Sequence, residues 1–454
     1  MTARIVAALS MLGCVCIVAA QTQAPPPNAK DTSIPPRPMV PAGAADTTIS
    51  SGTLTASDAV RIAIARQPTL EAVRQAVIAA EGRITQLRAS LLPHFGLTGN
   101  YGSTRYFGNE FRALDLNYIN GSSGAAVVTQ LLFDANHSSD LVRQSAALKS
   151  VAVQDLARAK ADLTLQVLVG YYLVGEAHQL VAVNERNVEN RDSQLQLAVS
   201  RFNSGLGGPD DVLTAQTAKG DAVVALVQAR TTEDTARMSL MQTLGVDPQT
   251  PFKIGDEGAA PVIINKYDDF VTLALSRRPE VLRAKAAIDA AKFGARAAKT
   301  TSAPVLSGSL NVNSSDPGFP AANGTYGLGL LLTVPVFDGN LTAGAVKEAQ
   351  AVLKSAQSDL ATAQLQVRTD VSQAYLAVRG AEQQSELSKT NVDNAKESLR
   401  IAEGRYKSGV GLFLDIINAQ AALLTAETNA ATALAEVSRQ RATLERAAGM
   451  LTNP

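Results

Sequence analysis

The stretch RYKSGVGLFLDIINAQ, residues 405–420, decides the fold, because the chain contains a second version of it. RFNSGLGGPDDVLTAQ, residues 201–216, lies 204 positions earlier and shares the Arg, the aromatic residue, the Gly, the Asp and the final Ala-Gln. The match runs without a gap from Phe133 to Gly245 of the first copy. Two units of about 200 residues are too long for a solenoid repeat and indicate a duplicated half-domain.

Each stretch has the features of a turn between two long helices. Gly205 and Gly409 are suited to end the helix before the turn. Asp211 and Asp415 are suited to cap, or to lie in the first turn of, the helix after it. The helix before the second turn is predicted over residues 341–406, and it has apolar or small residues at steps of three and four over residues 371–406. At 1.5 Å per residue, such a helix is about 100 Å long.

The small residues on these apolar seams allow helix axes to approach closely and predict coiled-coil packing. We therefore predict one long helical hairpin in each copy, at residues 135–245 and 340–449. A helix of this length cannot be covered within one compact subunit, so we expect it to lie against partners along its length.

A different pattern precedes each helical hairpin, at residues 94–133 and 304–337. Apolar and polar residues alternate there, as from Leu306 to Val312, and half of the 20 aromatic residues of the chain fall in these two segments. Each segment is predicted to form two strands of about ten residues with a polar loop between them. One apolar and one polar face are typical of transmembrane β-barrel strands, and an ordinary hairpin packed on helices is the alternative.

The composition excludes several classes of protein. Lys and Arg together number 41, as do Asp and Glu, so no net charge attracts nucleic acid or an acidic membrane. The only cysteines are Cys14 and Cys16, which excludes a disulfide framework or a thiolate metal site in the rest of the chain. His94, His137 and His178 are dispersed, and no nucleophile–base pair is visible. We expect no enzymatic activity, no metal and no cofactor.

The N-terminal residues indicate export from the cytoplasm. Arg4 precedes an apolar run that ends in small residues, so residues 1–20 are predicted to be a secretory signal peptide that is cleaved after Ala20. A lipoprotein signal with Cys14 acylated is the alternative. Residues 21–53 are rich in proline and are predicted to form a disordered lead.

The repeat also gives the domain boundaries. The first repeat is predicted to span residues 54–250 and the second residues 267–454, with a linker at residues 251–266 between them. The predicted fold class is mixed but mainly α-helical, with coiled-coil helical hairpins and four strands in an internally duplicated chain. Four strands cannot close a barrel, because the smallest outer-membrane barrels have eight, so an oligomer is required. This geometry alone does not choose a trimer over a dimer or a tetramer.

On these features the chain resembles the TolC/OprM family of bacterial outer-membrane efflux channels, from about Leu54 to Met450. The most specific feature is the tip motif, Arg/Lys-Phe/Tyr-x-x-Gly followed by Asp-Val/Ile-Leu/Ile-x-Ala-Gln, which occurs twice. The Leu/Val-Phe-Asp-x-Asn sequence at the start of each long helix also fits. The resemblance implies a homotrimer with a 12-stranded transmembrane β-barrel and an α-helical barrel in the periplasm.

The resemblance also implies a function. It predicts a trimeric outer-membrane channel of a tripartite efflux pump or a type I secretion system, a passive exit duct that extends from a Gram-negative-type outer membrane into the periplasm. The expected partners are outer-membrane lipid, a periplasmic membrane-fusion (adaptor) protein and an inner-membrane RND or ABC transporter, and not nucleic acid. The alternative is a structural coiled-coil periplasmic spacer or adaptor without a pore, which would not need two amphipathic β-hairpins.

Residues of the tip motifs have expected roles by resemblance. In the family, aspartates near the periplasmic tip form a ring that narrows the closed channel, and Asp415 matches one such position. We expect constriction or gating roles for Asp415, Asp211 and Tyr406, with Asp415 contributing more to the ring and Asp211 acting more as a helix cap. The arginine of the closing latch of the TolC type falls on Gly411, and an often acidic position falls on Asn418. The residues expected to dock an adaptor are Gly205, Leu206, Gly409, Val410, Gly411 and Leu412.

Overall fold

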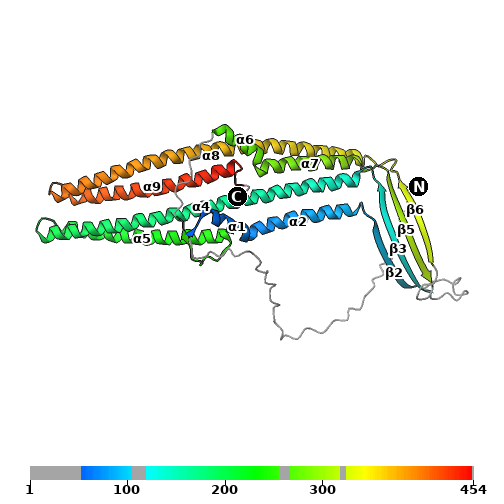
Figure 1. Ribbon diagram of the computed structural model, residues 1–454, viewed down its shortest axis with the longest axis horizontal. Helices are drawn as coiled ribbons and strands as arrows, with labels where there is room; N and C mark the ends of the chain where they lie inside the picture. Colours follow the sequence, from blue (N-terminus) through cyan, green and yellow to red (C-terminus); the bar gives the residue numbers. More distant parts are fainter. Residues whose placement is uncertain (1–52, 105–118, 256–265, 317–323, 452–454) are drawn as a thin grey trace, which may run out of the picture. The chain divides into compact units, whose positions relative to one another are not determined.

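The computed structural model describes residues 53–104, 119–255, 266–316 and 324–451, all within the compact unit Thr47–Pro454. The predicted signal peptide, with Cys14, and all but the last residue of the predicted Pro-rich lead lie outside these residues. Figure 1 shows the helices and strands in chain order. They are β1 (Thr53–Leu54), α1 (Ala56–Arg66), α2 (Pro68–Ala89), β2 (His94–Thr104), β3 (Ile119–Phe133), α4 (His137–Asn203), α5 (Pro209–Leu244), β4 (Lys253–Ile254), α6 (Tyr267–Arg277), α7 (Pro279–Lys299), β5 (Val305–Asp316), β6 (Gly324–Thr333), α8 (Leu341–Lys407) and α9 (Phe413–Ala447).

The structure repeats itself as the sequence does. The elements α1, α2, β2, β3, α4 and α5 of the first copy correspond in order to α6, α7, β5, β6, α8 and α9 of the second. The helices α4 and α8 each have 67 residues, which is about 100 Å at 1.5 Å per residue. The prediction of a mainly α-helical, internally duplicated chain with long helical hairpins and four strands in its sheet is confirmed.

The Phe-Asp-x-Asn sequence forms the same turn before each long helix. Asn136 and Asn340 have φ values of 68° and 71°, in the left-handed region that Asn tolerates better than most residues. Asp134 and Asp338 each accept a hydrogen bond from the backbone N–H four residues later, at 2.7 and 2.9 Å. These bonds satisfy N–H groups that the start of a helix otherwise leaves without a partner.

The helices of the two hairpins pack side by side in the order α5–α4–α9–α8, so the contact of α4 with α9 joins the two copies (Figure 1). The predicted seams are buried, as shown by Val167 and Val174 in α4 and by Val371 and Val378 in α8. Among these four helices, α5 packs mainly against α4 and α8 packs mainly against α9. The helices α5 and α8 are therefore the outer members of the row.

The long strands form one antiparallel sheet in the order β2-β3-β5-β6. Residues opposite one another across the strands share a face of the sheet, and the next row along points to the other face. On one face, two rows consist of large apolar or aromatic residues and a single alanine. They are Phe95, Val128, Leu310 and Leu328, and Leu97, Ala126, Val312 and Tyr326. Two rows of the other face are small or polar apart from one valine, and consist of Gly96, Val127, Asn311 and Gly327, and of Thr98, Ala125, Asn313 and Thr325.

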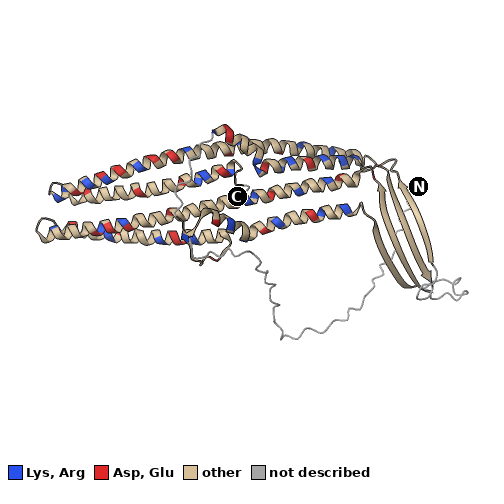
Figure 2. Cartoon of the chain, in the orientation of Figure 1, with Lys and Arg blue, Asp and Glu red and all other residues tan. Residues whose placement is uncertain are grey.

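Charged residues lie on the helices and are almost absent from the sheet (Figure 2). Within the described strands of the sheet, Asp316 at the end of β5 is the only Lys, Arg, Asp or Glu. An uncharged sheet with one apolar face suits contact with lipid. None of the described helices has an apolar stretch long enough to cross a membrane.

The end of the first copy is held against α4. The short strands β1 and β4 pair in parallel, and the Tyr171 hydroxyl donates to the carbonyl oxygens of Leu54 at 3.1 Å and Gly255 at 3.0 Å. Strand β4 lies in the predicted linker 251–266, of which residues 256–265 are outside the described part of the chain. The start of this linker is therefore attached to the first copy.

Candidate functional site

The two tip motifs end α4 and α8 in the same way. Gly205 and Gly409 have φ values of 71° and 80°, which a residue with a side chain adopts only with strain. In the first tip, the N–H groups of Gly205 and Leu206 donate to the carbonyl oxygens of Phe202 at 3.0 Å and Arg201 at 2.9 Å. The equivalent bonds of the second tip measure 3.1 and 3.0 Å. This is the Schellman arrangement, which uses carbonyl groups that the end of a helix leaves free.

Each tip loop then folds back onto the end of its own helix. A Cβ atom on Gly207 would lie 3.2 Å from the Cβ of Arg201, and one on Gly411 would lie 2.9 Å from the Cβ of Arg405. Gly411 is the position onto which the latch arginine of the TolC type falls. A side chain at this position would collide with the end of α8, so this loop conformation excludes an arginine there.

Arg201 joins the two tips. Its Nη1 donates to the backbone oxygens of Tyr406 at 2.8 Å and Lys407 at 3.4 Å, at the end of α8, and its Nη2 donates to that of Leu206 at 3.3 Å. Its guanidinium carbon lies 4.5 Å from the centre of the Tyr406 ring, within the range of a cation–π contact. A cation at the last carbonyl groups of a helix also suits the helix dipole. Arg201 was not among the site residues predicted from the sequence, although its presence in the repeated motif was a signal.

Tyr406 and Asp211 form a second link between the tips. The Tyr406 side chain is 4% exposed, its ring centre lies 5.4 Å from that of Phe413, and its hydroxyl donates to Asp211 Oδ2 at 3.0 Å. Burial, followed by the hydrogen bond to Asp211 and the charge of that carboxylate, raises the pKa of Tyr406 to about 12. The tyrosine therefore remains a neutral donor at physiological pH. The structure thus brings together two of the three predicted gating residues.

Asp415 makes different contacts. Its Oδ2 accepts a hydrogen bond from the N–H of Leu412 at 3.2 Å, and its own N–H donates to the Leu412 carbonyl at 3.1 Å. At the start of α5, by contrast, Gly208 is the N-cap and no side chain caps the helix. The expectation that Asp211 acts mainly as a cap is therefore wrong. Asp211 instead accepts a hydrogen bond from the Tyr406 hydroxyl of the other hairpin.

The six predicted docking residues all lie in the two tip loops. Leu206, Val410 and Leu412 are 70%, 85% and 68% exposed, and the glycines between them shape the loops. Apolar side chains this exposed at the end of a helical hairpin form a surface suited to contact with another protein.

A buried polar layer between α4 and α9 was also not predicted from the sequence. The amide of Gln194 donates to Gln420 at 3.4 Å, and the amide of Gln420 donates to Asn187 at 3.4 Å. Arg191 donates to Gln194, also at 3.4 Å. All four side chains are buried. The signal was Arg191, which occupies a position of the apolar seam where a small or apolar residue is expected.

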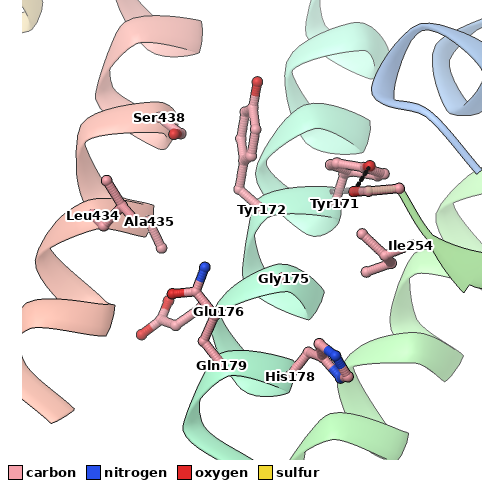
Figure 3. Close-up of a pocket in the computed structure, with 11 residues that line it drawn as sticks. Tyr171, Tyr172, Gly175, Glu176, His178, Gln179, Ile254, Leu434, Ala435 and Ser438 are labelled. Atoms are coloured by element: carbon pink, nitrogen blue, oxygen red, sulfur yellow. Dashed lines mark hydrogen bonds between the residues drawn. The ribbon is translucent and has the colours of Figure 1, made fainter. Parts of the chain in front are cut away.

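A separate concave site lies between α4, β4 and α9. Its cavity has a volume of about 350 Å³ and is lined in part by Tyr171, Tyr172, Glu176 and His178 (Figure 3). Glu176 forms an ion pair with Arg439, and His178 Nδ1 lies 3.0 Å from Glu233 Oε1. The ionisable groups Glu176 and His178 are thus already engaged within the chain. In the described ranges, no three or more His, Cys, Asp or Glu side chains are grouped so as to hold a metal ion.

Residues 59–246 and 270–450, one segment in each copy, match the family described as "Outer membrane efflux protein". The chain belongs to this family. Protein CyaE of Bordetella pertussis is 26% identical over 400 residues, which cover 87% of this chain and 84% of CyaE. Outer membrane protein TolC of Escherichia coli is 24% identical over 371 residues, which cover 78% of this chain and 74% of TolC.

A solved structure of the family has the same fold. The outer membrane protein VceC of Vibrio cholerae matches with a TM-score of 0.74 at 16% identity, over 87% of this chain and 96% of VceC. The chain is therefore an outer-membrane efflux protein that extends into the periplasm, and the predicted localisation and channel function are confirmed. The family is one of transport channels rather than enzymes. Nothing in these similarities supports a spacer without a pore.

Proposed function

We propose that three copies of this outer-membrane efflux protein form one exit duct, in which the sheets close a 12-stranded barrel and the helical hairpins close a tunnel. The observation that carries the proposal is that the chain has open edges in both layers. In the sheet, β2 and β6 each have one neighbouring strand, and in the row of long helices α5 and α8 each pack mainly against one neighbour. An edge strand with no partner favours pairing with another chain.

The outer helices carry exposed apolar side chains on one side. On α8, Leu365, Leu376 and Leu387 are 63%, 65% and 66% exposed, and a spacing of 11 residues keeps them on one side of the helix. On α5, Val223 and Val227 are also exposed, and a spacing of four places them on one side. Packing of α8 from one copy against α5 of the next would bury both rows.

The repeat predicts the register between neighbouring sheets. Within the chain, Ala126 of β3 lies opposite Val312 of β5. Strand β6 repeats β3 at an offset of 204 residues, and β2 repeats β5 at an offset of 211. Leu330 therefore corresponds to Ala126, and Tyr101 corresponds to Val312. When β6 of one copy pairs with β2 of the next as β3 pairs with β5, Leu330 lies opposite Tyr101. A head-to-tail contact of this kind closes a ring when its rotation divides the circle.

Cysteine crosslinking tests this ring. In the double variant Leu330→Cys, Tyr101→Cys, oxidation of the protein in the outer membrane is expected to link chains into covalent dimers and trimers, and into nothing larger. The matched control pairs Leu330→Cys with Leu97→Cys, because Leu97 lies on the same face of β2 but about 13 Å further along the strand. Equal linkage in the control, no linkage in the first variant or a ladder beyond three chains would contradict the trimer.

At the tips, we infer that a periplasmic membrane-fusion (adaptor) protein docks and connects the duct to an inner-membrane transporter of the RND or ABC class. The exposed Leu206, Val410 and Leu412 support this inference. Leu412→Glu is expected to abolish export by cells while the crosslinked trimer still forms. Leu148→Glu is the control, since Leu148 is an exposed leucine of α4 that lies 55 residues before the end of that helix. Normal export in the Leu412 variant would refute docking at this loop.

We also propose that the tips narrow the duct. The links from Arg201 and Asp211 to α8 hold the two hairpins of one chain together, and Asp415 adds an exposed carboxylate from each copy. A narrow ring of negatively charged carboxylates favours the passage of cations over anions. Asp415→Asn is expected to reduce cation selectivity and block by multivalent cations in single-channel recordings. Unchanged selectivity and block would remove Asp415 from the constriction.

A further inference from the structure

The two tips have equivalent backbones but unequal side-chain contacts. Their helix-ending hydrogen bonds match, and each arginine packs its Cβ against the equivalent loop glycine. Arg201 nevertheless donates three hydrogen bonds, two of them to the end of the neighbouring hairpin. Arg405 is exposed, and its side chain has no hydrogen bond or ion pair within the described residues. The second arginine is therefore placed like the first but has no hairpin of its own chain beside it.

The aromatic residue that follows each arginine is also covered to a different extent in the two tips. Tyr406 is covered by Arg201 and Phe413 and is 4% exposed, whereas Phe202 is 46% exposed. Arg201 covers Tyr406 across the junction from the first hairpin to the second. Across a junction from the second hairpin to the first hairpin of another copy, the repeat would place Arg405 against Phe202.

We propose that Arg405 of one copy clasps the end of α4 in the next copy. Its guanidinium donates to the backbone oxygens of Phe202 and Asn203 and covers the Phe202 ring, as Arg201 does for Lys407 and Tyr406. This proposal rests on the proposed trimer, whose head-to-tail ring gives every Arg405 a neighbouring Phe202. Arginine clasps within chains and between chains then alternate around the tips.

The two kinds of clasp differ by one hydroxyl group. Within a chain, Tyr406 donates to Asp211. Between chains, the equivalent residues are Phe202 and Asp415, and a phenyl ring has nothing to donate. The clasp between chains therefore lacks one hydrogen bond to a carboxylate, which belongs to the stronger class of hydrogen bonds. We conclude that the tips separate first between chains rather than within them.

Two substitutions with opposite expected effects test the clasp in full-length channels in planar bilayers. Phe202→Tyr supplies the missing hydroxyl, which can donate to Asp415 because a carboxylate that already accepts one hydrogen bond can accept another. This added bond between chains is expected to lower the conductance at least twofold. Arg405→Met keeps the aliphatic stem and is expected to raise the conductance at least twofold. In an Asp415→Asn background, Phe202→Tyr is expected to have a much smaller effect, which is the coupling that a double-mutant cycle measures. Arg400→Met is the control, since Arg400 is an exposed arginine of the same helix that pairs with Glu397.

The Leu330–Tyr101 crosslink separates this proposal from the one on which it rests. Crosslinked trimers in which both Phe202→Tyr and Arg405→Met conduct like the wild type would overturn the Arg405 clasp and leave the duct intact. A channel in which the Phe202→Tyr effect is the same with Asp415→Asn would overturn the assigned partner of the new hydroxyl. Absence of the crosslink itself would overturn both proposals.

Discussion

At the scale of single residues, the contacts of the tip converge on Tyr406. Arg201 lies over its ring, Phe413 lies beside it, and Asp211 accepts a hydrogen bond from its hydroxyl. Its pKa of about 12 lies above the usual value of 10, so the neutral form is favoured. The stability that depends on this neutral form is fully present below pH 10 and is lost as the pH rises through 12. The link is therefore expected to hold across the physiological range.

Tyr406→Phe removes one hydrogen bond to a carboxylate and leaves the ring contacts in place. Loss of such a bond weakens the link between the hairpins by about 1.5–3 kcal/mol. We expect a larger single-channel conductance and trimers of normal stability. Tyr375→Phe, in the same helix but 31 residues before Tyr406, is expected to conduct like the wild type. A Tyr406 variant with wild-type conductance would show that the hydroxyl does not restrain the tips.

The sequence predicts the positions of the site residues better than their partners. The repeat and the turn chemistry place Asp211 and Asp415 correctly in the first turns of α5 and α9. Asp415 bonds to the backbone of Leu412, whereas Asp211 bonds to the hydroxyl of Tyr406 in the opposing hairpin. That is a contact between residues almost 200 positions apart, and local spacing carries no information about it. For the same reason, the hydrogen bonds of Arg201 to the end of α8 could not be predicted from its position in the motif.

At the scale of elements, a buried polar layer lies between α4 and α9, where the two copies meet. Gln420→Leu removes both the donor to Asn187 and the acceptor from Gln194. Each buried group left without a partner costs about 1–3 kcal/mol, so we expect a lower melting temperature of the detergent-solubilised protein. Gln216→Leu is the matched control, since Gln216 ends the same motif in the first copy but is exposed. Equal melting temperatures of the two variants would mean that the layer contributes little.

Ion pairs also fasten α7 and α9 to α4. Arg446 donates to Asp162 at 2.5 Å and to Glu280 at 2.8 Å, and Arg278 donates to Glu280 at 3.1 Å. Burial alone would raise the pKa of Glu280, but the hydrogen bond and charge of Arg278, with the charge of Arg446, lower it to about 2. A carboxylate with a lowered pKa stabilises the fold above its unfolded pKa, and this contribution is lost as the pH falls toward 2.

Glu280→Gln should therefore destabilise the protein at neutral pH by about 1–3 kcal/mol, because it leaves two arginines without their shared carboxylate. The difference in melting temperature from the wild type is expected to shrink between pH 4.5 and 2. Glu397→Gln serves as the comparison, because Glu397 pairs with Arg400 at the surface of α8. A deficit of the Glu280 variant that stays constant with pH would contradict the assignment.

Elements with a strong local period are predictable, and their pairing is less so. The steps of three and four residues in α8 and the alternation in β5 are properties of a short window of sequence. The order α5–α4–α9–α8 and the pairing of β3 with β5 depend on contacts between the copies. Arg446 and Asp162, which hold the copies together, are 284 positions apart, and no periodicity relates them.

At the scale of the whole molecule, the two faces of the sheet are expected to meet lipid and water. Leu330 and Leu331 are adjacent in β6 and point to opposite faces, opposite Gly308 and Ser307 of β5. Leu330→Arg is expected to impair assembly, because an arginine facing lipid costs up to about 2–4 kcal/mol. Leu331→Arg, on the opposite face, is expected to be tolerated. The yield of folded protein in outer-membrane fractions measures both, and equal yields would contradict the assignment of the faces.

The equal lengths of α4 and α8, 67 residues each, constrain how the gene can change. Deletion of one codon in α4 alone would draw its loop back by about 1.5 Å and rotate it by about 100° relative to its neighbours. The return helices α5 and α9 would lose register with it. A longer or shorter reach across the periplasm therefore requires insertions or deletions of whole helical turns at four sites in the gene, in step. Point substitutions can change the contacts at the ends of this protein, but the length of its helical hairpins can change only when all four long helices change together.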